Sequence, residues 1–384
     1  MDTRDVPLPL LLSEIETPAL LLDRARLEAN AARMRTRCAA LGVRLRPHLK
    51  TAKSINVACV ALADGAPCLT VSTLKEAEYL AAAGYADILY ATAIAPQKLA
   101  HAARIQAGGA DLLLVADSLA VVEAAEGFCA RSGTILSFLV EIDCGEHRSG
   151  LLPDQPEVVE LARAIADAPH LRFRGVMTHA GHSYASDKIA DVVRTAAAER
   201  DAAVKAAEAI RAAGIPVEIV SVGSTPTVLH ADHLHGVTEV RCGIYMFWDL
   251  AQVSRHICGL DDIAVSVLAT VIGHNRAARA LILDAGALAL SKDLGANTFL
   301  PDVRYGYVCD AATGQRLGAL SVASVHQEHG HVPVEDPAWF DRLPVGATVR
   351  ILPNHACLTC AAYDRYEVVE QGIVTGRWPR ISGW

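Results

Sequence analysis

A lysine with a histidine two residues before it lies directly after a short apolar run. In RPHLKTAKS, residues 46–54, Lys50 follows the strand expected at Val43–Arg46, and His48 would point to the same side if the extended conformation continued. At the mouth of a parallel barrel, such a lysine can lose part of its hydration and act as an amine nucleophile. On these residues alone, a solvated surface pair of Lys50 and Lys53 is the better explanation.

Two glycine-containing turns later in the chain could bind a phosphate group. In VSVGSTPT, residues 220–227, an expected strand runs into Gly-Ser-Thr and then into a proline that suits the start of a helix. Backbone N–H groups at such a turn, with the hydroxyls of Ser224 and Thr225, can cradle a phosphate. In CGIY, which follows the strand expected at Thr238–Arg241, Gly243 lets the backbone approach an anion closely. Each could be an ordinary turn, but two of them at the seventh and eighth βα positions favour a phosphate site.

A histidine and a cysteine near the C-terminus could bind a metal ion. In LPNHACLTC, residues 352–360, His355 and Cys357 would face the same side of a strand end, and imidazole and thiolate are ligands that zinc prefers. The spacing of Cys357 and Cys360 would also suit a redox pair or half of a zinc ribbon. However, no second CxxC lies nearby, and no strand–motif–helix pattern surrounds this one. A buried histidine beside inert thiols explains the segment as well as a metal site does.

The composition limits the class of protein to which these residues belong. With 384 residues, 52% of them hydrophobic, the chain is long enough for one large globular domain and a smaller one. The net charge of −8 argues against binding to nucleic acid or to an anionic membrane. Ten cysteines without regular spacing predict reduced thiols, and the N-terminal segment resembles neither a signal peptide nor a membrane span. We therefore expect a cytoplasmic enzyme.

Apolar runs alternate with amphipathic helical stretches from about residue 19 to residue 241, which predicts parallel βαβ units. About eight such units favour a (β/α)₈ barrel, the TIM-type fold, over an open doubly wound sheet, and no GxGxxG motif follows an early strand. The expected strands are Ala19–Leu22, Val43–Arg46, Leu69–Val71, Ile88–Tyr90, Leu112–Val115, Ile135–Ile142, Phe173–Met177, Val217–Val222 and Thr238–Arg241. The expected helices are Arg24–Ala40, Thr73–Ala83, Pro96–Ala107, Leu119–Ala130, Glu157–Ala166 and Ile189–Ala213.

The pattern changes after about residue 260, where strands follow one another without long helices between them. These strands are expected at Ile263–Ile272, Ala280–Asp284, Leu320–Val325, Thr348–Leu352 and Tyr366–Val374. The chain is therefore an α/β protein with two expected domains. Residues 19–258 form the barrel, and residues 1–18 with 259–384 form an all-β domain that carries the metal pair.

Taken together, the motifs resemble those of one enzyme family nearly from end to end. The chain is similar to the D-serine dehydratase and D-threonine aldolase family, pyridoxal-phosphate enzymes with an alanine-racemase-like barrel and a C-terminal β domain. The matching segments, in order, are RPHLKTAKS, TVSTLKEAE (70–78), DILYA (87–91), VEIDCGEHRSG (140–150), THAGHSY (178–184), VSVGSTPT, TEVRCGIYMFWD (238–249), DAG (284–286), QEHG (327–330) and PNHACLTC (353–360).

This resemblance implies a role for each matching residue. Lys50 would carry the cofactor as a Schiff base and act with His48 in catalysis. Arg148 would lie near the pyridine nitrogen, and Tyr184 would lie beside the ring. His355 and Cys357 would bind a divalent metal, with zinc expected and manganese or another ion as the alternative. The phosphate-binding positions would be Gly223, Ser224, Thr225, Gly243 and Ile244. Ala52 departs from the family, since many members have histidine there.

The resemblance also implies a reaction. A dehydratase would convert D-serine, D-threonine or D-threo-3-hydroxyaspartate to a 2-oxo acid and ammonia. Lys50 would take the Cα proton, and the metal would assist loss of the 3-hydroxyl group. The main alternative is an aldolase that releases glycine and an aldehyde. Aldolase members tend to have aspartate where this chain has Cys357, which favours the dehydratase.

Two other activities share the barrel and its lysine. An amino-acid racemase would need a second base and no metal, and a non-catalytic pyridoxal-phosphate carrier would lack the C-terminal domain. A homodimer is expected from the resemblance. Arg304 or His329 could bind a second carboxylate of the substrate.

Overall fold

The computed structural model describes residues 8–63, 65 and 67–384, and these form two compact units. The barrel unit contains Ala32–Lys50, Ala61–Gly243 and the last two residues. The strand-rich unit contains the described residues up to Ala31, Thr51–Val60 and Ile244–Ser382. The chain therefore passes from the barrel unit to the strand-rich unit directly after Lys50.

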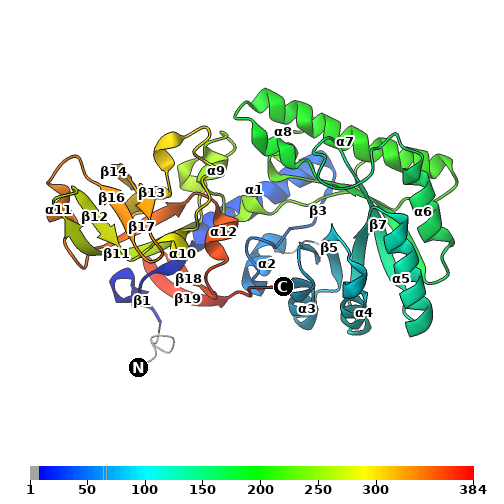
Figure 1. Cartoon of the computed structure of the whole chain (residues 1–384), viewed down its shortest axis with the longest axis horizontal. Coiled ribbons are helices and arrows are strands. Elements are labelled where there is room, and N and C mark those ends of the chain that lie inside the picture. The colour runs from blue at the N-terminus through cyan, green and yellow to red at the C-terminus, as the bar shows by residue number, and fades with distance from the viewer. Residues whose placement is uncertain (1–7, 64, 66) are drawn as a thin grey trace. The chain divides into compact units, whose positions relative to one another are not determined.

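Eight parallel strands form the sheet of the barrel unit, in the order β3-β10-β9-β8-β7-β6-β5-β4. Figure 1 labels β3, β5 and β7 of this sheet. A parallel bridge between His48, just beyond β3, and Thr70 of β4 brings the first and last strands of this order together. The predicted barrel is thereby confirmed. Its strands are β3 (Arg44–Leu45), β4 (Cys68–Val71), β5 (Asp87–Ala93), β6 (Asp111–Ala116), β7 (Leu136–Ile142), β8 (Leu171–Thr178), β9 (Ile219–Val222) and β10 (Glu239–Val240).

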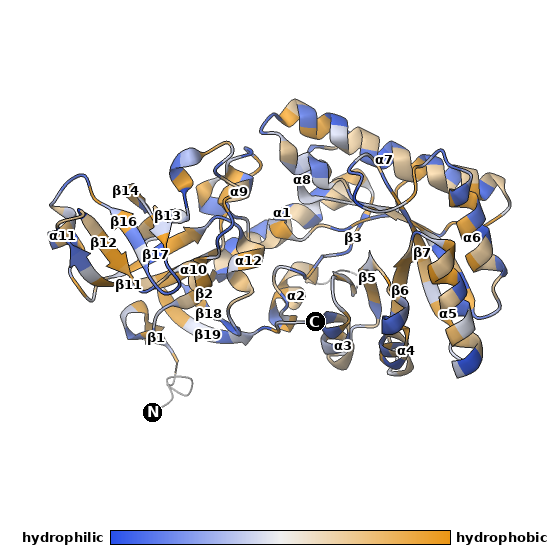
Figure 2. Ribbon diagram, viewed as in Figure 1, coloured by the Kyte–Doolittle hydropathy of each residue, from blue (hydrophilic) through white to orange (hydrophobic). Residues whose placement is uncertain are grey.

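The helices that follow these strands place small and apolar residues toward the sheet. In α6 the buried residues are spaced three or four apart, at Val158, Leu161, Ala162 and Ile165. This is the spacing of one helical face, and Figure 2 shows the resulting stripes of apolar and polar residues on α5, α6 and α7. The helices are α3 (Leu74–Ala82), α4 (Leu99–Ala107), α5 (Leu119–Ser132), α6 (Glu157–Asp167), α7 (Ile189–Ala212) and α8 (Thr225–His230).

Local signals set the ends of these helices. The hydroxyl of Thr73 accepts a hydrogen bond from the backbone N–H of Glu76 and so caps α3. Helix α5 ends where Gly133 adopts a left-handed φ of 69°. The six predicted helices all form, with ends that differ by a few residues from those expected. Helix α2 (Ile55–Leu62) was not predicted, and α1 (Arg24–Leu41) begins in the strand-rich unit and ends in the barrel unit.

The strand-rich unit contains a mixed sheet in which β11 is central, because it pairs with β2, β12 and β17. Short helices α9 (Leu250–Val253), α10 (Ala287–Leu290), α11 (Trp339–Arg342) and α12 (Ala356–Cys360) lie between its strands. The strands are β1 (Leu10–Leu11), β2 (Ala19–Asp23), β11 (Val265–Asn275), β12 (Ala280–Leu283), β13 (Gly306–Asp310), β14 (Arg316–Ser321), β15 (Ser324–Val325), β16 (Gly330–Pro333), β17 (Thr348–Pro353), β18 (Arg365–Glu370) and β19 (Ile373–Pro379).

The strand predicted at Ala19–Leu22 was assigned to the barrel, and this assignment is wrong. It forms as β2, but it pairs antiparallel with β11 and parallel with β18. Its residues Ala19–Leu22 are all buried, as in a strand covered on both faces, and this pattern suits either sheet. Among the described residues, no helix has both the length and the apolar character needed to span a membrane.

Candidate active site

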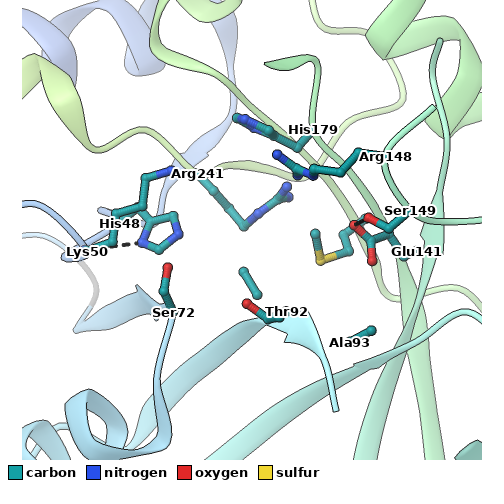
Figure 3. A pocket seen from close by; sticks show the side chains of 12 residues that line it. His48, Lys50, Ser72, Thr92, Ala93, Glu141, Arg148, Ser149, His179 and Arg241 are labelled. Atoms are coloured by element: carbon teal, nitrogen blue, oxygen red, sulfur yellow. Dashed lines mark hydrogen bonds between the residues drawn. The ribbon is translucent and has the colours of Figure 1, made fainter. Parts of the chain in front are cut away.

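A cavity of about 330 Å³ in the barrel unit contains the predicted lysine. In Figure 3, His48 and Lys50 lie on one side of this cavity and Glu141, Arg148 and Ser149 on the other. The side chains that line it come from the C-terminal ends of several barrel strands, where barrel enzymes place their active sites. They are His48, Lys50, Ser72, Ala91, Thr92, Ala93, Glu141, Arg148, Ser149, Met177, His179 and Arg241.

The backbone around Lys50 is held by the strands on both sides of it. The N–H of His48 donates to the carbonyl of Cys242 (2.7 Å), and the N–H of Leu49 donates to the carbonyl of Thr70 (2.8 Å). The extended conformation of the strand does not continue to Lys50, which lies in a turn. The condition under which His48 and Lys50 would point to the same side of a strand is therefore not met. The backbone N–H of Lys50 donates to His48 Nδ1 at 3.4 Å. Both side chains nevertheless line the same cavity.

The two histidines of the cavity are uncharged at neutral pH. Burial lowers the pKa of His48 well below its usual value, and the nearby Lys50 and Arg241 lower it further. Burial and the charge of Lys50 likewise lower the pKa of His179 to about 3. At neutral pH each imidazole can therefore donate a hydrogen bond from one ring nitrogen and accept one at the other, without adding positive charge to the cavity.

Three residues of this cavity were missed by sequence reasoning: Arg241, His179 and Glu141. Arg241 is buried and is held by hydrogen bonds to the hydroxyl of Ser221 (2.7 Å) and the carbonyl of Thr178 (2.5 Å). Arg241 and His179 each directly follow a barrel strand, and that position was the available signal.

Glu141 is the cavity's carboxylate, and it accepts a hydrogen bond from the hydroxyl of Ser149 at 2.8 Å. Burial raises its pKa above the usual value. With Lys50, Arg148 and Arg241, the cavity contains three cationic side chains for this one carboxylate. Such a balance favours anionic ligands, including phosphates and carboxylates.

The two predicted phosphate turns follow β9 and β10, the seventh and eighth strands of the barrel. A Cβ added to Gly223 would lie 2.7 Å from the backbone nitrogen of Arg241, and a Cβ added to Gly243 would lie 2.7 Å from the backbone carbonyl oxygen of His48. Glycine is therefore required at both positions. Ser224 caps α8 with its hydroxyl, which accepts a hydrogen bond from the N–H of Thr227.

The Thr225 hydroxyl supports a phosphate site at the first of these turns. It is buried and, apart from the neighbouring Cys242 thiol, has no hydrogen-bond partner among the described residues. A buried hydroxyl without a partner is unfavourable, and a phosphate oxygen would supply one. Ile244 directly follows Gly243 in the chain. Tyr184 lies in a short 3₁₀ helix, Gly181–Ala185, and does not contribute to the cavity lining given above.

The predicted metal pair lies in the strand-rich unit, but not on a strand as expected. The strand β17 ends at Pro353, His355 precedes α12, and Cys357 lies in its first turn. His355 Nδ1 contacts Asp293 Oδ2 at 2.7 Å, which leaves Nε2 for a metal ion. Within the described residues no group of three or more His, Cys, Asp or Glu side chains surrounds a common metal position.

The surroundings of His355 favour a cation. Burial alone would lower its pKa, but Cys357, Asp249 and Asp293 together raise it to about 10. The same negative groups would attract a metal ion. A site with two protein ligands leaves coordination positions open for water or substrate, as catalytic rather than structural metal sites do.

Arg304 and His329 also lie in the strand-rich unit, and neither lines the cavity around Lys50. Arg304 follows the 3₁₀ helix Pro301–Val303, and His329 precedes β16. Their suggested contact with a substrate carboxylate remains a prediction.

Two family models match the chain along its length. The model for the N-terminal domain of alanine racemase matches residues 22–251, and the model described as "Putative serine dehydratase domain" matches residues 264–369. The chain belongs to the alanine racemase N-terminal domain family, a family of pyridoxal-phosphate enzymes, and within it to the members that carry the serine dehydratase domain.

Particular relatives narrow the comparison further. The D-threo-3-hydroxyaspartate dehydratase of Delftia sp. (strain HT23) is 44% identical, over 97% of this chain and 99% of its own length. Its solved structure aligns with a TM-score of 0.94, covering 97% of this chain and all of the other. A D-serine dehydratase of Dictyostelium discoideum is 30% identical, over 93% and 94% of the two chains. A 3-hydroxy-D-aspartate aldolase of Paracoccus denitrificans is 31% identical, over 96% and 92%. The predicted family and the predicted lyase class are confirmed.

Proposed function

We propose that this protein is a dehydratase of D-configured 3-hydroxy amino acids that depends on pyridoxal phosphate and a divalent metal. D-threo-3-hydroxyaspartate, D-serine and D-threonine are the candidate substrates, and a 2-oxo acid and ammonia are the products. One contact carries the proposal. Cys357 Sγ lies 3.0 Å from the hydroxyl of Thr51, the residue that follows Lys50 in the chain. The metal pair is thus in contact with the residue next to the proposed catalytic lysine.

The residues of the cavity, together with two turns that contact them, suit the cofactor. The hydroxyl of Thr225 and the turn at Gly243 would hold the phosphate, and Lys50 would hold the cofactor through its amine. When bound, pyridoxal phosphate supplies an electron sink for the electron pair left at Cα of the substrate. Arg148 is assigned to the pyridine nitrogen by the resemblance, and Tyr184 to a position beside the ring.

Removal of the Cα proton is the task of Lys50. The Lys50 amine would serve as the base, and Arg241, which lines the same cavity, would supply positive charge for a substrate carboxylate. The uncharged His48, which accepts a hydrogen bond from the backbone N–H of Lys50, would help to position this lysine.

His355 and Cys357 would hold the metal, which when bound supplies a Lewis acid for the departing 3-hydroxyl group. Two solved structures of variants of a D-threo-3-hydroxyaspartate dehydratase support this pair. One is a histidine variant, and the other is a cysteine variant two positions further along the chain, in the metal-free form. His355 and Cys357 have the same spacing here. We propose zinc as the metal because of the thiolate ligand, to be tested by metal analysis of the purified protein.

Chemical trapping tests the role of Lys50. Reduction of the protein with borohydride, followed by peptide mapping, should place the cofactor on Lys50. An active protein that carries no label at this position would exclude the proposed function.

Product analysis separates the dehydratase from an aldolase. The three candidate substrates should yield a 2-oxo acid and ammonia, whereas glycine and an aldehyde as main products would identify an aldolase. The higher identity to the dehydratase, 44% against 31%, and the cysteine at position 357 favour the dehydratase. We expect a Cys357→Asp variant to bind metal but to shift the products toward glycine and aldehyde. The parent protein, assayed beside it with the same metal, is the control.

We also propose that the protein is a cytoplasmic homodimer. None of its ten cysteines forms a disulfide bond in the structure, as expected in a reducing compartment. Sedimentation of the purified protein would measure the mass of the assembly, and cell fractionation would test the location.

A further inference from the structure

Helix α7 has one carboxylate on its buried face. The other buried residues of this helix are alanine, valine and isoleucine, spaced mainly three or four apart. Position 199 belongs to this face, and Glu199 is only 2% exposed. A glutamate buried among small apolar residues is unfavourable unless hydrogen-bond donors surround its oxygens. Glu199 therefore requires a structural or functional explanation.

Three donors surround the Glu199 carboxylate. Oε1 accepts hydrogen bonds from the backbone N–H of Ala180 (2.8 Å) and of Gly223 (3.1 Å). Oε2 accepts one from the hydroxyl of Thr227 at 2.7 Å. No lysine or arginine forms an ion pair with it among the described residues. Burial raises its pKa, although these hydrogen bonds and the charge of Arg241 oppose the effect.

The three donors belong to two segments that contact each other, and one of these segments carries His179, which lines the cavity. Ala180 follows His179, which lines the cavity and whose Nδ1 contacts the carbonyl oxygen of Gly223. Gly223 and Thr227 belong to the turn between β9 and α8, where the Thr225 hydroxyl has no hydrogen-bond partner among the described residues apart from the Cys242 thiol. Helix α7 packs against α8 (Figure 1). The Glu199 side chain of α7 thereby reaches the turn that precedes α8.

This arrangement determines which groups of the turn can meet a ligand. The N–H of Gly223 is directed to Glu199 and cannot bind a phosphate. The N–H of Ser224 is directed to the hydroxyl of Thr227, which Glu199 holds in place. The Thr225 hydroxyl is left for the ligand. Glu199 itself does not line the cavity, so it has no direct part in the chemistry.

We propose that Glu199 is a positioning residue that holds the phosphate-binding turn in shape and, through Ala180 and Gly223, fixes the position of His179. This inference rests on the proposed function, because it assumes that the turn binds the phosphate of pyridoxal phosphate. Substitution of Glu199 should therefore weaken the binding of pyridoxal phosphate more than the binding of pyridoxal, which lacks the phosphate.

The test compares the affinities of the cofactor-free protein for pyridoxal phosphate and for pyridoxal, measured by absorbance titration. Glu199→Ala should bind pyridoxal phosphate about tenfold more weakly, as expected for the loss of buried hydrogen bonds. Its affinity for pyridoxal should stay close to that of the parent. Glu199→Gln should restore the parent affinities, because its carbonyl oxygen can accept both N–H groups and Thr227 can accept from its amide nitrogen.

A second buried glutamate provides the matched control. Glu367 in β18 is also 2% exposed, and it is bound by Arg365 (2.7 Å) and Arg377 (3.0 Å) in the strand-rich unit. Glu367→Gln should lower thermal stability but leave the ratio of the two affinities unchanged. If Glu199→Ala does not fold, Thr227→Val removes one of the three contacts and should change the ratio in the same direction.

Two results would overturn the inference: unchanged binding of pyridoxal phosphate by Glu199→Ala, or an equal loss of affinity for both molecules. A failure of the proposed function is visible earlier, in the parent protein. If the parent bound pyridoxal phosphate no more tightly than pyridoxal, the turn would not be a phosphate site, whatever the variants did.

Discussion

At the scale of single residues, the cavity keeps its two histidines uncharged beside several cations. His179 is close to Lys50 and Arg241, and its buried imidazole has a pKa of about 3. In the unfolded chain the value is about 6.5. Between these two pH values the unfolded chain binds a proton that the folded protein does not, so acid favours unfolding. The stability contributed by this residue is present above pH 6.5 and is lost as the pH falls.

The lowered pKa of His179 predicts how the variant His179→Gln changes the pH dependence of stability. In the parent protein without cofactor, the free energy of unfolding should fall between pH 7 and pH 5, and His179 should account for about 2 kcal/mol of that fall. The variant should lose less stability over this range by about the same amount. Urea denaturation at both pH values measures the difference. His48, whose pKa is shifted in the same direction, remains in the variant and preserves the rest of the effect. An identical pH dependence in both proteins would contradict the assigned pKa.

At the scale of elements, the turn after β10 lies in close contact with the segment that carries Lys50. A Cβ at Gly243 would lie 2.7 Å from the carbonyl oxygen of His48 and 3.2 Å from its Cβ. One of the two segments would have to shift to accept even a methyl group. The close approach of these segments therefore depends on glycine.

We predict that Gly243→Ala weakens the binding of pyridoxal phosphate about tenfold and destabilises the protein by about 1–3 kcal/mol. Absorbance titration and thermal unfolding measure the two effects. Gly214→Ala is the control, since its φ of +81° makes alanine unfavourable while no atom lies within 4 Å of the added Cβ. The control should lose stability but bind the cofactor as the parent does. Normal binding by Gly243→Ala would show that the turn is not part of the site.

Helix α5 contains a glycine that the fold does not require. Gly127 lies within the helix, and an added Cβ would meet only the flexible end of Arg131 at 3.4 Å. Glycine lowers helix stability relative to alanine, so Gly127→Ala should raise the free energy of unfolding by about 0.5–1 kcal/mol without changing activity. Denaturant unfolding and an activity assay would check both expectations. A destabilised variant would mean that the helix needs the space that glycine leaves.

At the scale of the whole molecule, the chain passes from the barrel unit to the strand-rich unit directly after Lys50. Thr51–Val60 belongs to the strand-rich unit, although Lys50 belongs to the barrel unit. Within the strand-rich unit, the Tyr366 hydroxyl donates to the carbonyl of Ala52 at 2.6 Å, and Thr51 contacts Cys357. The residues that follow the lysine are thus held by the unit that contains the metal pair.

Metal removal should therefore destabilise the folded protein. A ligand present at a hundred times its Kd stabilises the native state by about 2.7 kcal/mol, so a chelator should lower the thermal unfolding temperature by several degrees. Calorimetry of the protein with and without chelator measures the shift, and re-addition of metal should reverse it. Cys357→Ala should unfold at the same temperature with and without chelator. An equal shift in this variant would place the metal elsewhere.

Much of the fold could be predicted from local sequence patterns. The helical stretch ending before Gly214 has a hydrophobic spacing and a stop signal that depend on a few neighbouring residues, and it forms as α7. The motifs around Lys50, Ser224 and His355 carried the family resemblance. In contrast, Arg241, His179 and Glu141 lie inside matching segments but were given no role, because the sequence does not show which side chains of a segment will enter a cavity.

The sequence by itself determined the alternation of strands and helices, the lysine at a strand end and the two glycine turns, because backbone geometry and hydrophobic spacing act over short distances. Only the tertiary structure decided that β2 joins the strand-rich sheet, that His355 and Cys357 lie at a helix start, and that Glu199 meets Ala180 and Gly223. These outcomes depend on pairing between residues far apart in the chain. Such pairing is selected by the burial and hydrogen bonding of the complete fold, and no local pattern records it.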